Sequence, residues 1–273
     1  MNKAIPMSSM DTTIAGAGLA KSVALSSDAH PQALLALPQG EARESLLAVH
    51  SVLRAELPEG TLSLYEAGGG STSFLPLDVV ARAHTTVVDL DEEQLRNNDY
   101  AQRRIVGDIQ HHQFPRDSFD FVICYNVIEH VPDVAAALTR MFHSLKRGGL
   151  VLIGAPNPHS LSGAVTKYSP HWFHRWFYRY IIGNKLAGLP GQPPFRTFYH
   201  PLVTPSKLVA FARAHGLELV YRREYENVHF AETRERIPLL GALLDAFAVT
   251  LNFLLPGDAE VRRGDYHIIL RRR

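Results

Sequence analysis

A glycine-rich run near the middle of the N-terminal half carries the first residues that could bind a ligand. It reads Glu66-Ala67-Gly68-Gly69-Gly70-Ser71-Thr72-Ser73 and follows a short apolar stretch. Glycines at the end of a strand let the backbone approach a ligand and turn tightly into a helix. The dinucleotide fingerprint G-x-G-x-x-G is not met, because Ser73 replaces the third glycine. Glu66 would repel a pyrophosphate, so the run favours a positively charged ligand.

Polar side chains recur where the next strands are expected to end. Asp89 could accept hydrogen bonds from both hydroxyls of a ribose. Asp108 could accept one from an exocyclic amine, while Ile109 covers a purine face. Asn126 opens the segment that runs to Val131. Each feature alone also suits a turn or a helix cap, but four in order at one edge of a sheet favour a binding site.

The elements that must position these residues alternate between strands and helices. We expect helices at Gly40 to Leu57, Asp133 to Lys146 and Pro205 to His215, with Asp133 as an N-cap and Gly148-Gly149 closing the second helix. This pattern predicts an α/β fold: a Rossmann-like, doubly wound, mostly parallel seven-stranded sheet with helices on both faces. The predicted strands are Leu62 to Ala67, Thr85 to Leu90, Arg104 to Asp108, Phe119 to Tyr125, Leu150 to Ala155, Leu217 to Tyr221 and Asp265 to Leu270.

Three segments depart from that alternation. Residues 1–29 lack a periodic apolar pattern and are predicted to be mobile, which leaves 30–273 as the folded domain. Residues 156–205 are aromatic and rich in proline, and are predicted to form a cap inserted into the domain. Residues 237–256 are apolar and predicted to be a helix, but they contain Pro238 and Asp245, so we expect no transmembrane span.

Composition excludes several classes of protein. Hydrophobic residues make up 46% of the 273 residues and charged residues 20%, which excludes a disordered or collagen-like chain. The only cysteine, Cys124, cannot form an internal disulfide or a Cys-based zinc site, so a reducing, cytoplasmic location is expected. His171 and His174 have no carboxylate or thiol near them in the sequence, and no metal is predicted.

The net charge of +1 hides a strong asymmetry along the chain. Residues 1–133 carry 9 Lys and Arg against 18 Asp and Glu, whereas residues 134–217 carry 10 basic residues and no acidic one. This basic stretch is either a solvated face or a surface for an anionic substrate or lipid head groups. Its basic residues are spaced out, so binding of nucleic acid is not expected.

Together these motifs resemble those of the class I S-adenosylmethionine-dependent methyltransferases, in particular the small-molecule branch called type 11. The likeness covers roughly residues 60–155: the acid and glycines of Glu66 to Thr72, the run from Asp117 to Val122, the Ile128-Glu129-His130-Val131 stretch and Leu145 to Gly149. Thr72 departs from the family's third glycine. The resemblance implies S-adenosylmethionine as cofactor and S-adenosylhomocysteine as product, with Asp89 at the ribose and Asp108 at the adenine amine. The implied cofactor-binding residues are Glu66, Ala67, Gly68, Gly70, Ser71, Asp89, Leu90, Asp108, Ile109 and Asn126.

Methyl transfer to a hydroxyl or an acidic carbon also needs a proton acceptor, and a histidine suits that role near neutral pH. His130, just beyond the fourth strand, is the first candidate, and His200 in the insertion is the second; a structural role for His130 stays open. Trp172, Trp176 and Tyr180 are spaced four apart, so the cap helix could pack on the core, close over a substrate or lie at a lipid interface. The candidate substrate residues are Tyr168, His171, Trp172, Arg175, Trp176, Arg179, Arg196 and Tyr199.

The sequence therefore predicts a small-molecule methyltransferase, most simply an O-methyltransferase whose acceptor is apolar or aromatic, with or without an anionic group. A second interpretation is C-methylation of a quinone or prenyl-like lipid at a membrane surface, with peripheral membrane contact. A third is a module that keeps the cofactor pocket but has lost catalysis. An NAD-dependent dehydrogenase is disfavoured by Glu66 and by the missing third glycine. The chain is expected to be a monomer or a homodimer.

Overall fold

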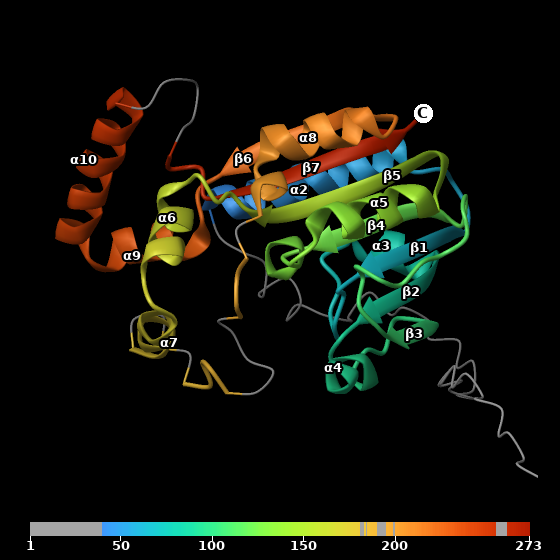
Figure 1. Ribbon diagram of the computed structural model, residues 1–273, viewed down its shortest axis with the longest axis horizontal. Helices are drawn as coiled ribbons and strands as arrows, with labels where there is room; N and C mark the ends of the chain where they lie inside the picture. Colours follow the sequence, from blue (N-terminus) through green and yellow to red (C-terminus); the bar gives the residue numbers. More distant parts are fainter. Residues whose placement is uncertain (1–39, 181–182, 184, 190–194, 199, 255–260) are drawn as a thin grey trace, which may run out of the picture.

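The computed structural model describes residues 40–180, 183, 185–189, 195–198, 200–254 and 261–273. The predicted mobile segment 1–29 lies outside these residues. The described part of the chain contains a seven-stranded sheet with the order β3-β2-β1-β4-β5-β7-β6 (Figure 1). Its strands are β1 (Leu62–Ala67), β2 (Ala83–Asp89), β3 (Arg103–Val106), β4 (Phe119–Tyr125), β5 (Leu145–Pro156), β6 (Leu217–Tyr225) and β7 (Asp265–Arg272).

Strand direction confirms the predicted Rossmann-like, mostly parallel sheet. The pairs β1–β2, β1–β4, β2–β3 and β4–β5 are parallel, whereas β7 runs antiparallel to both β5 and β6. Because β7 runs in the opposite direction, its first residue, Asp265, pairs with Pro156 at the end of β5. The carboxyl ends of the parallel strands and the start of β7 therefore share one edge of the sheet.

Both faces of the sheet are covered by helices, because alternate side chains of each strand enter different apolar cores. On β4, Val122 and Cys124 pack with residues of α5 and α8, whereas Phe121 and Ile123 pack with residues of α2 and α3. This burial on both faces explains why β4 is apolar apart from Asp120 near its start. The helices are α2 (Gly40–Glu56), α3 (Leu77–Ala81), α4 (Glu92–Arg96), η1 (Ile128–His130), α5 (Val134–Ser144), α6 (Leu161–Tyr168), α7 (His171–Tyr180), η2 (Pro201–Val203), α8 (Pro205–Ala214), α9 (Val228–Arg236) and α10 (Pro238–Leu254).

The end of α5 differs from the prediction. Asp133 caps the helix as expected, with its side chain accepting a hydrogen bond from the Ala136 amide. The helix then stops at Ser144, and Gly148-Gly149 do not close it. Instead Leu145 pairs with Phe119 and Leu150 with Phe121, so the residues between Leu145 and Leu150 form a bulge in β5. Gly148 at φ 77° suits that bulge, because only glycine adopts this backbone conformation at little cost.

Strand ends also differ by a few residues from the predicted ones. β3 stops at Val106, so Asp108 lies in the turn that follows rather than at the tip of the strand. β6 continues four residues past Tyr221, because its pairing with β7 extends to Tyr225 and Asp265. Both differences arise from pairing between strands, which local composition does not determine.

The cap helices α6, α7, α9 and α10 lie together at one end of the molecule, beyond the edge where the parallel strands finish (Figure 1). The helix α10 falls within the apolar stretch 237–256 and packs on α6 and α9 through Leu244, Ala248, Leu161 and Phe230. Among the described residues, no helix is both long and apolar enough to cross a membrane.

Candidate functional site

The glycine loop after β1 adopts a conformation that side chains would prevent. Gly68 and Gly70 have φ values of 73° and 52°, in the left-handed region that favours glycine. A Cβ atom on Gly68 would lie 2.5 Å from Cγ1 of Val127, in the loop after β4. The Gly68 amide donates to the Val88 carbonyl at 2.8 Å and joins the loop to β2. The loop backbone is therefore held open at the edge where β1, β2 and β4 finish.

Asp89 closes this loop from the end of β2. Its Oδ2 accepts a hydrogen bond from the Gly70 amide at 2.9 Å, and its Oδ1 accepts one from the Asp91 amide at 2.9 Å. The structure thus brings the predicted ribose-binding carboxylate against the predicted glycine loop. Each carboxylate oxygen keeps a further lone pair, so Asp89 can still accept hydrogen bonds from a ligand.

Glu66 is buried beneath the glycine loop. Its carboxyl oxygens accept hydrogen bonds from the hydroxyls of Ser73 and Tyr100. Burial raises the pKa of Glu66 to about 7, although both hydrogen bonds act to lower it. A cationic ligand nearby would therefore stabilise the ionised carboxylate. The sequence did not single out Tyr100, and treated Ser73 only as a departure from a glycine motif.

Asp108 and Ile109 follow β3 at the same edge. Although partial burial acts to raise the pKa of Asp108, hydrogen bonds from Gln110 and His111 hold it below its usual value. Ile109 is buried in the core, whereas Leu90, after β2, is 71% exposed. Leu90 lines an open depression of about 520 Å³ with Asp91, Glu92, Glu93 and Arg96.

The loop after β4 contributes a polar residue beside the glycine loop. Asn126 is exposed and has a φ of 54°. Its backbone amide donates a hydrogen bond to the Gly154 carbonyl at 2.8 Å. Its neighbour Val127 is the residue that approaches Gly68. The predicted cofactor residues of β1, β2 and β4 therefore meet around one loop.

His130 is held in a defined protonation state in η1. Its Nδ1 lies 2.8 Å from the carbonyl oxygen of Arg196, so Nδ1 carries a proton and donates. Burial lowers the pKa of His130, and the hydrogen bond to Arg196 only partly offsets that effect. The imidazole is therefore neutral near pH 7, with the lone pair on Nε2. Such a group is suited to accept a proton.

The neighbour of His130, Glu129, is a buried acid that the sequence did not single out as a site residue. Its Oε1 lies 3.7 Å from Nε2 of His130, and its Oε2 has no hydrogen-bond partner among the described residues. Burial raises the pKa of Glu129 to about 8, and the negative charge of Asp265 adds to the effect. The backbone carbonyl of Glu129 accepts from the Phe198 amide at 2.9 Å, which ties the insertion to the site.

A second buried polar group missed by the sequence analysis surrounds His267 of β7. Its Nε2 lies 2.8 Å from the hydroxyl of Tyr125 and 3.0 Å from that of Tyr225, and its Nδ1 lies 2.7 Å from Oγ of Ser45. Burial lowers the pKa of His267 to about 3, so this imidazole is neutral. Position could have signalled Tyr125, which ends β4 directly before Asn126, but the others depend on tertiary contacts.

The remaining predicted residues lie in the insertion. His200 caps η2, where its Nδ1 accepts from the Leu202 amide at 3.2 Å. Trp172, Trp176 and Tyr180 share an exposed face of α7, as their spacing predicts. Tyr199 and the side chains of Tyr168 and His171 lie outside the described residues. Arg196 contacts His130 through its backbone carbonyl. The guanidinium carbon of Arg196 lies 5.1 Å from the centre of the Phe198 ring.

Arg175 and Arg179 of α7 both meet the turn at residues 185–189. Arg179 donates to the Ala187 carbonyl at 3.0 Å, and a Cβ atom on Gly188 would meet the side chain of Arg175. Within the described residues no three His, Cys, Asp or Glu side chains gather as metal ligands would.

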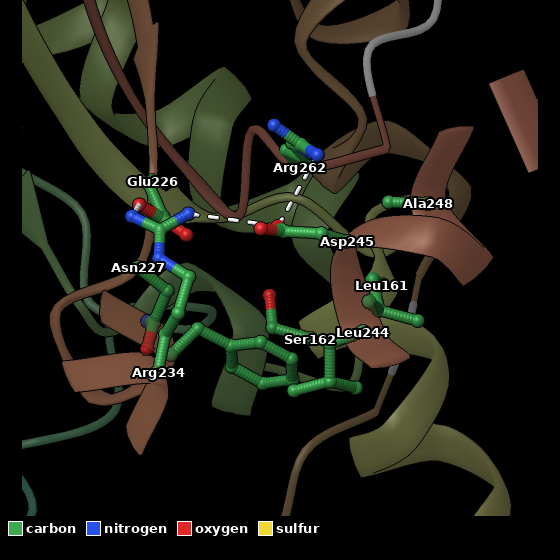
Figure 2. Close-up of a pocket in the computed structure, with 10 residues that line it drawn as sticks. Leu161, Ser162, Glu226, Asn227, Arg234, Leu244, Asp245, Ala248 and Arg262 are labelled. Atoms are coloured by element: carbon green, nitrogen blue, oxygen red, sulfur yellow. Dashed lines mark hydrogen bonds and ion pairs between the residues drawn. The ribbon is translucent and has the colours of Figure 1, made fainter. Parts of the chain in front are cut away.

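A small cavity between α6, α9 and α10 is not an acceptor site. It measures about 20 Å³, which is room for one water molecule. Asp245 lies beside the cavity and forms ion pairs with Arg262 at 3.2 Å and with Arg234 at 3.7 Å. Arg234 also forms an ion pair with Glu226 at 2.7 Å (Figure 2). These ion pairs hold α10 against the rest of the molecule.

Comparisons with known proteins agree with this geometry. Residues 66–153 match the family model described as "Methyltransferase domain", which confirms the predicted resemblance for that part of the chain. The chain is 38% identical over 89 residues to a ubiquinone biosynthesis O-methyltransferase of Bradyrhizobium sp. (strain ORS 278), a match that covers 27% of this chain and 35% of that protein. It is also 38% identical over 65 residues to the protein of that name from Rhodopseudomonas palustris (strain BisB18), covering 24% and 26%. The chain thus spans about a third or less of these curated relatives.

A solved structure extends the likeness of fold to most of the chain. The magnesium protoporphyrin IX methyltransferase of Synechocystis PCC 6803, solved with bound S-adenosylhomocysteine, aligns with a TM-score of 0.50 and 14% identity. That alignment covers 84% of this chain and 83% of the other. At this identity the likeness establishes the fold alone.

Proposed function

We propose that this chain, which carries a class I methyltransferase domain over residues 66–153, transfers a methyl group from S-adenosylmethionine to a small acceptor. The observation that carries the proposal is the glycine loop, in which Gly68 and Gly70 are left-handed and the Gly70 amide donates a hydrogen bond to Asp89, within the segment that matches the family. The glycine loop and Asp89 both belong to the segment that matches the family, and both lie at the edge where such sheets bind ligands.

The residues present fit the proposed cofactor. When bound, S-adenosylmethionine supplies an electrophilic methyl group on a positively charged sulfur. The backbone of Gly68 and Gly70 can lie against the ligand, while Asp89 accepts from ribose hydroxyls. Asp108 accepts from the adenine amine, and the exposed side chain of Leu90 is available to cover the ring. Glu66 contributes a negative charge under the loop, next to Ala67, with Ser71, Ile109 and Asn126 completing the proposed set.

His130 is the proposed proton acceptor. Its hydrogen bond to Arg196 leaves Nε2 free to receive the proton of an acceptor hydroxyl. Since catalysis here depends on aligning the acceptor with the methyl group, no covalent nucleophile is required. His200 is the lesser candidate, because its Nδ1 already serves as a helix cap.

The proposed reaction is O-methylation of an apolar or aromatic acceptor, which the names of the two curated relatives support. The basic residues Arg175, Arg179 and Arg196 would suit an acceptor with a carboxylate or phosphate. A nucleic acid is not part of the proposal, and a cytoplasmic monomer or homodimer remains our expectation.

A second candidate is C-methylation of a quinone or prenyl-like lipid at a membrane surface. The specific observation in its favour is the exposed apolar surface of α7 and α10, where Trp172, Leu239 and Phe253 are at least two-thirds exposed. A cofactor-binding module without catalysis is the third candidate.

Two measurements test the proposal. Calorimetry should detect binding of S-adenosylhomocysteine but not of NAD, and mass spectrometry should detect a product heavier by CH₂ after incubation with hydroxylated aromatics and quinols. Absence of S-adenosylhomocysteine binding would refute the proposal. Binding without any product across the panel would favour the inactive module, and a product methylated on carbon would favour the second candidate.

A further inference from the structure

Large apolar side chains are exposed along α10. Its exposed residues include Leu239 at 77%, Leu243 at 62% and Phe247 at 52%, each four positions apart and therefore on one side of the helix. Phe253, near the end of the helix, is 89% exposed. Exposed apolar side chains that share one helix face mark an interaction surface.

The charged residue of α10 does not interrupt this face. Asp245 is the only Asp, Glu, Lys or Arg in the helix, and it turns toward Arg234 and Arg262 beside the small cavity (Figure 2). Leu244 and Ala248 face the same way and pack on Leu161. The inner side of α10 thus holds the helix in place, and its outer side has no charge to keep it in water.

The helix α7 has a different surface, which combines rings with basic groups. Trp172 and Tyr180 are each 68% exposed, Trp176 is 45% exposed, and Arg175 lies exposed among them. Tryptophan and tyrosine prefer the boundary between lipid tails and water, and arginine binds lipid phosphates. The surface of α7 is therefore suited to the head-group layer of a membrane.

Charge points to an anionic lipid surface rather than to a second copy of the chain. The charged residues of α7 are Arg175 and Arg179, both basic, and the turn that they meet contains Lys185. Two copies meeting through α7 would bring like charges together, whereas basic residues are attracted to an anionic bilayer. Both α7 and α10 lie at the same end of the molecule, beyond the carboxyl ends of the parallel strands (Figure 1).

We infer that this end of the molecule is a docking surface for anionic phospholipid membranes. The outer face of α10 inserts among the acyl chains, and the tryptophans and arginines of α7 lie at the head groups. The protein then binds peripherally, through these two helices. This inference does not depend on the proposed reaction, because the contact is made by residues outside the cofactor loop.

The chain supplies its own reporter for this contact. Its two tryptophans, Trp172 and Trp176, are both in α7. Vesicles of phosphatidylglycerol and phosphatidylcholine should shift the emission of the full-length protein to shorter wavelength, and brominated acyl chains should quench it. Vesicles of phosphatidylcholine alone should bind at least about tenfold more weakly, because the electrostatic attraction is lost. An emission unchanged by anionic vesicles would overturn the inference.

Substitutions test the contributions of α10 and α7 to vesicle binding separately. In vesicle flotation, Leu239→Ser and Phe253→Ser should each weaken binding by about tenfold or more, since each removes a side chain that inserts into lipid. Leu77→Ser in α3, where the leucine is 64% exposed, is the matched control and should bind like the wild type. Arg175→Gln should weaken binding at low salt only, whereas Arg96→Gln in α4 should not.

The remaining outcomes also decide the question. Circular dichroism and the unfolding temperature confirm that each variant is folded. If both α10 variants bind vesicles as well as the wild type does, the inference is wrong. Light scattering that reveals a dimer, dissociated by Phe253→Ser, in a protein that does not bind vesicles would assign the face to a second copy instead.

Discussion

Glu129 should make the stability of this protein fall as the pH rises, and Glu129→Gln should remove that loss. The carboxyl group is 5% exposed, and its Oε2 has no hydrogen-bond partner among the described residues. Burial raises its pKa from the ordinary value of 4.5 to about 8. A raised pKa means that the folded state holds the proton more tightly than the unfolded state does. Stability is therefore greatest below pH 4.5 with respect to this group, and falls until the pH passes 8.

The size of the effect follows from the two pKa values. At roughly 1.4 kcal/mol for each pH unit, the difference between 4.5 and 8 corresponds to about 5 kcal/mol above pH 8. This figure is an upper limit, because rearrangement of the loop would admit water to the ionised group. Glutamine is nearly isosteric with glutamate and stays neutral. The free energy of unfolding of the variant should therefore differ only slightly from that of the wild type at pH 5 and exceed it by several kcal/mol at pH 9.

Denaturant unfolding of both proteins between pH 5 and pH 9 measures this difference. Glu59→Gln, at an exposed position after α2, controls for the loss of one negative charge and should show no such trend. The comparison requires that the m value, the slope of the unfolding free energy against denaturant concentration, is the same in all three proteins. A difference between Glu129→Gln and the wild type that stays constant with pH would show that Glu129 is solvated or paired, and would refute the reasoning.

Three further substitutions test the site. Asp89→Ala should weaken the binding of S-adenosylhomocysteine by about 1–3 kcal/mol in calorimetry, and unchanged affinity would exclude Asp89 from the ribose site. His130→Ala should lower turnover while leaving that affinity nearly unchanged; full activity would remove His130 as the proton acceptor. Gly68→Ala should destabilise the protein by about 1–3 kcal/mol, because its φ is 73° and its Cβ would meet Val127. Val127→Ala in the same chain should restore part of that loss in thermal unfolding, and no recovery would mean that backbone strain alone is responsible.

The sequence alone was sufficient to predict the strands and the glycine loop that position the site. β1 and β4 begin and end where the sequence predicts, because strands buried on both faces are mostly apolar, with Glu66 and Asp120 as the acidic exceptions. Asp89 could be placed for the same reason: a polar residue at the end of such a run has to lie at the edge of the sheet. The glycine loop followed from the type of its residues, since the left-handed conformation of Gly68 and Gly70 is costly for any other residue.

The residues that the sequence did not reveal are those defined by contacts between distant parts of the chain. His267 joins Tyr125 of β4 to Tyr225 of β6 and Ser45 of α2, and no spacing along the chain records those contacts. Tyr100 reaches Glu66 from the segment before β3 in the same way. The bulge in β5 was misread because Gly148-Gly149 is also a common helix end, and only the pairing of Leu145 with Phe119 distinguishes the two.

The opposite net charges of residues 1–133 and residues 134–217 can be related to their places in the folded molecule. Residues 1–133 supply Glu66, Asp89 and Asp108 to the edge that is proposed to bind the cofactor, where negative charge would favour a sulfonium. The basic stretch contributes α7 to the cap end, beyond that same edge (Figure 1). Separating the two charges would let the edge hold the proposed cationic cofactor while the adjoining end approaches the proposed anionic membrane. The net charge of +1 is then the sum of two opposite requirements, and changing the charge of either part should affect only its own ligand.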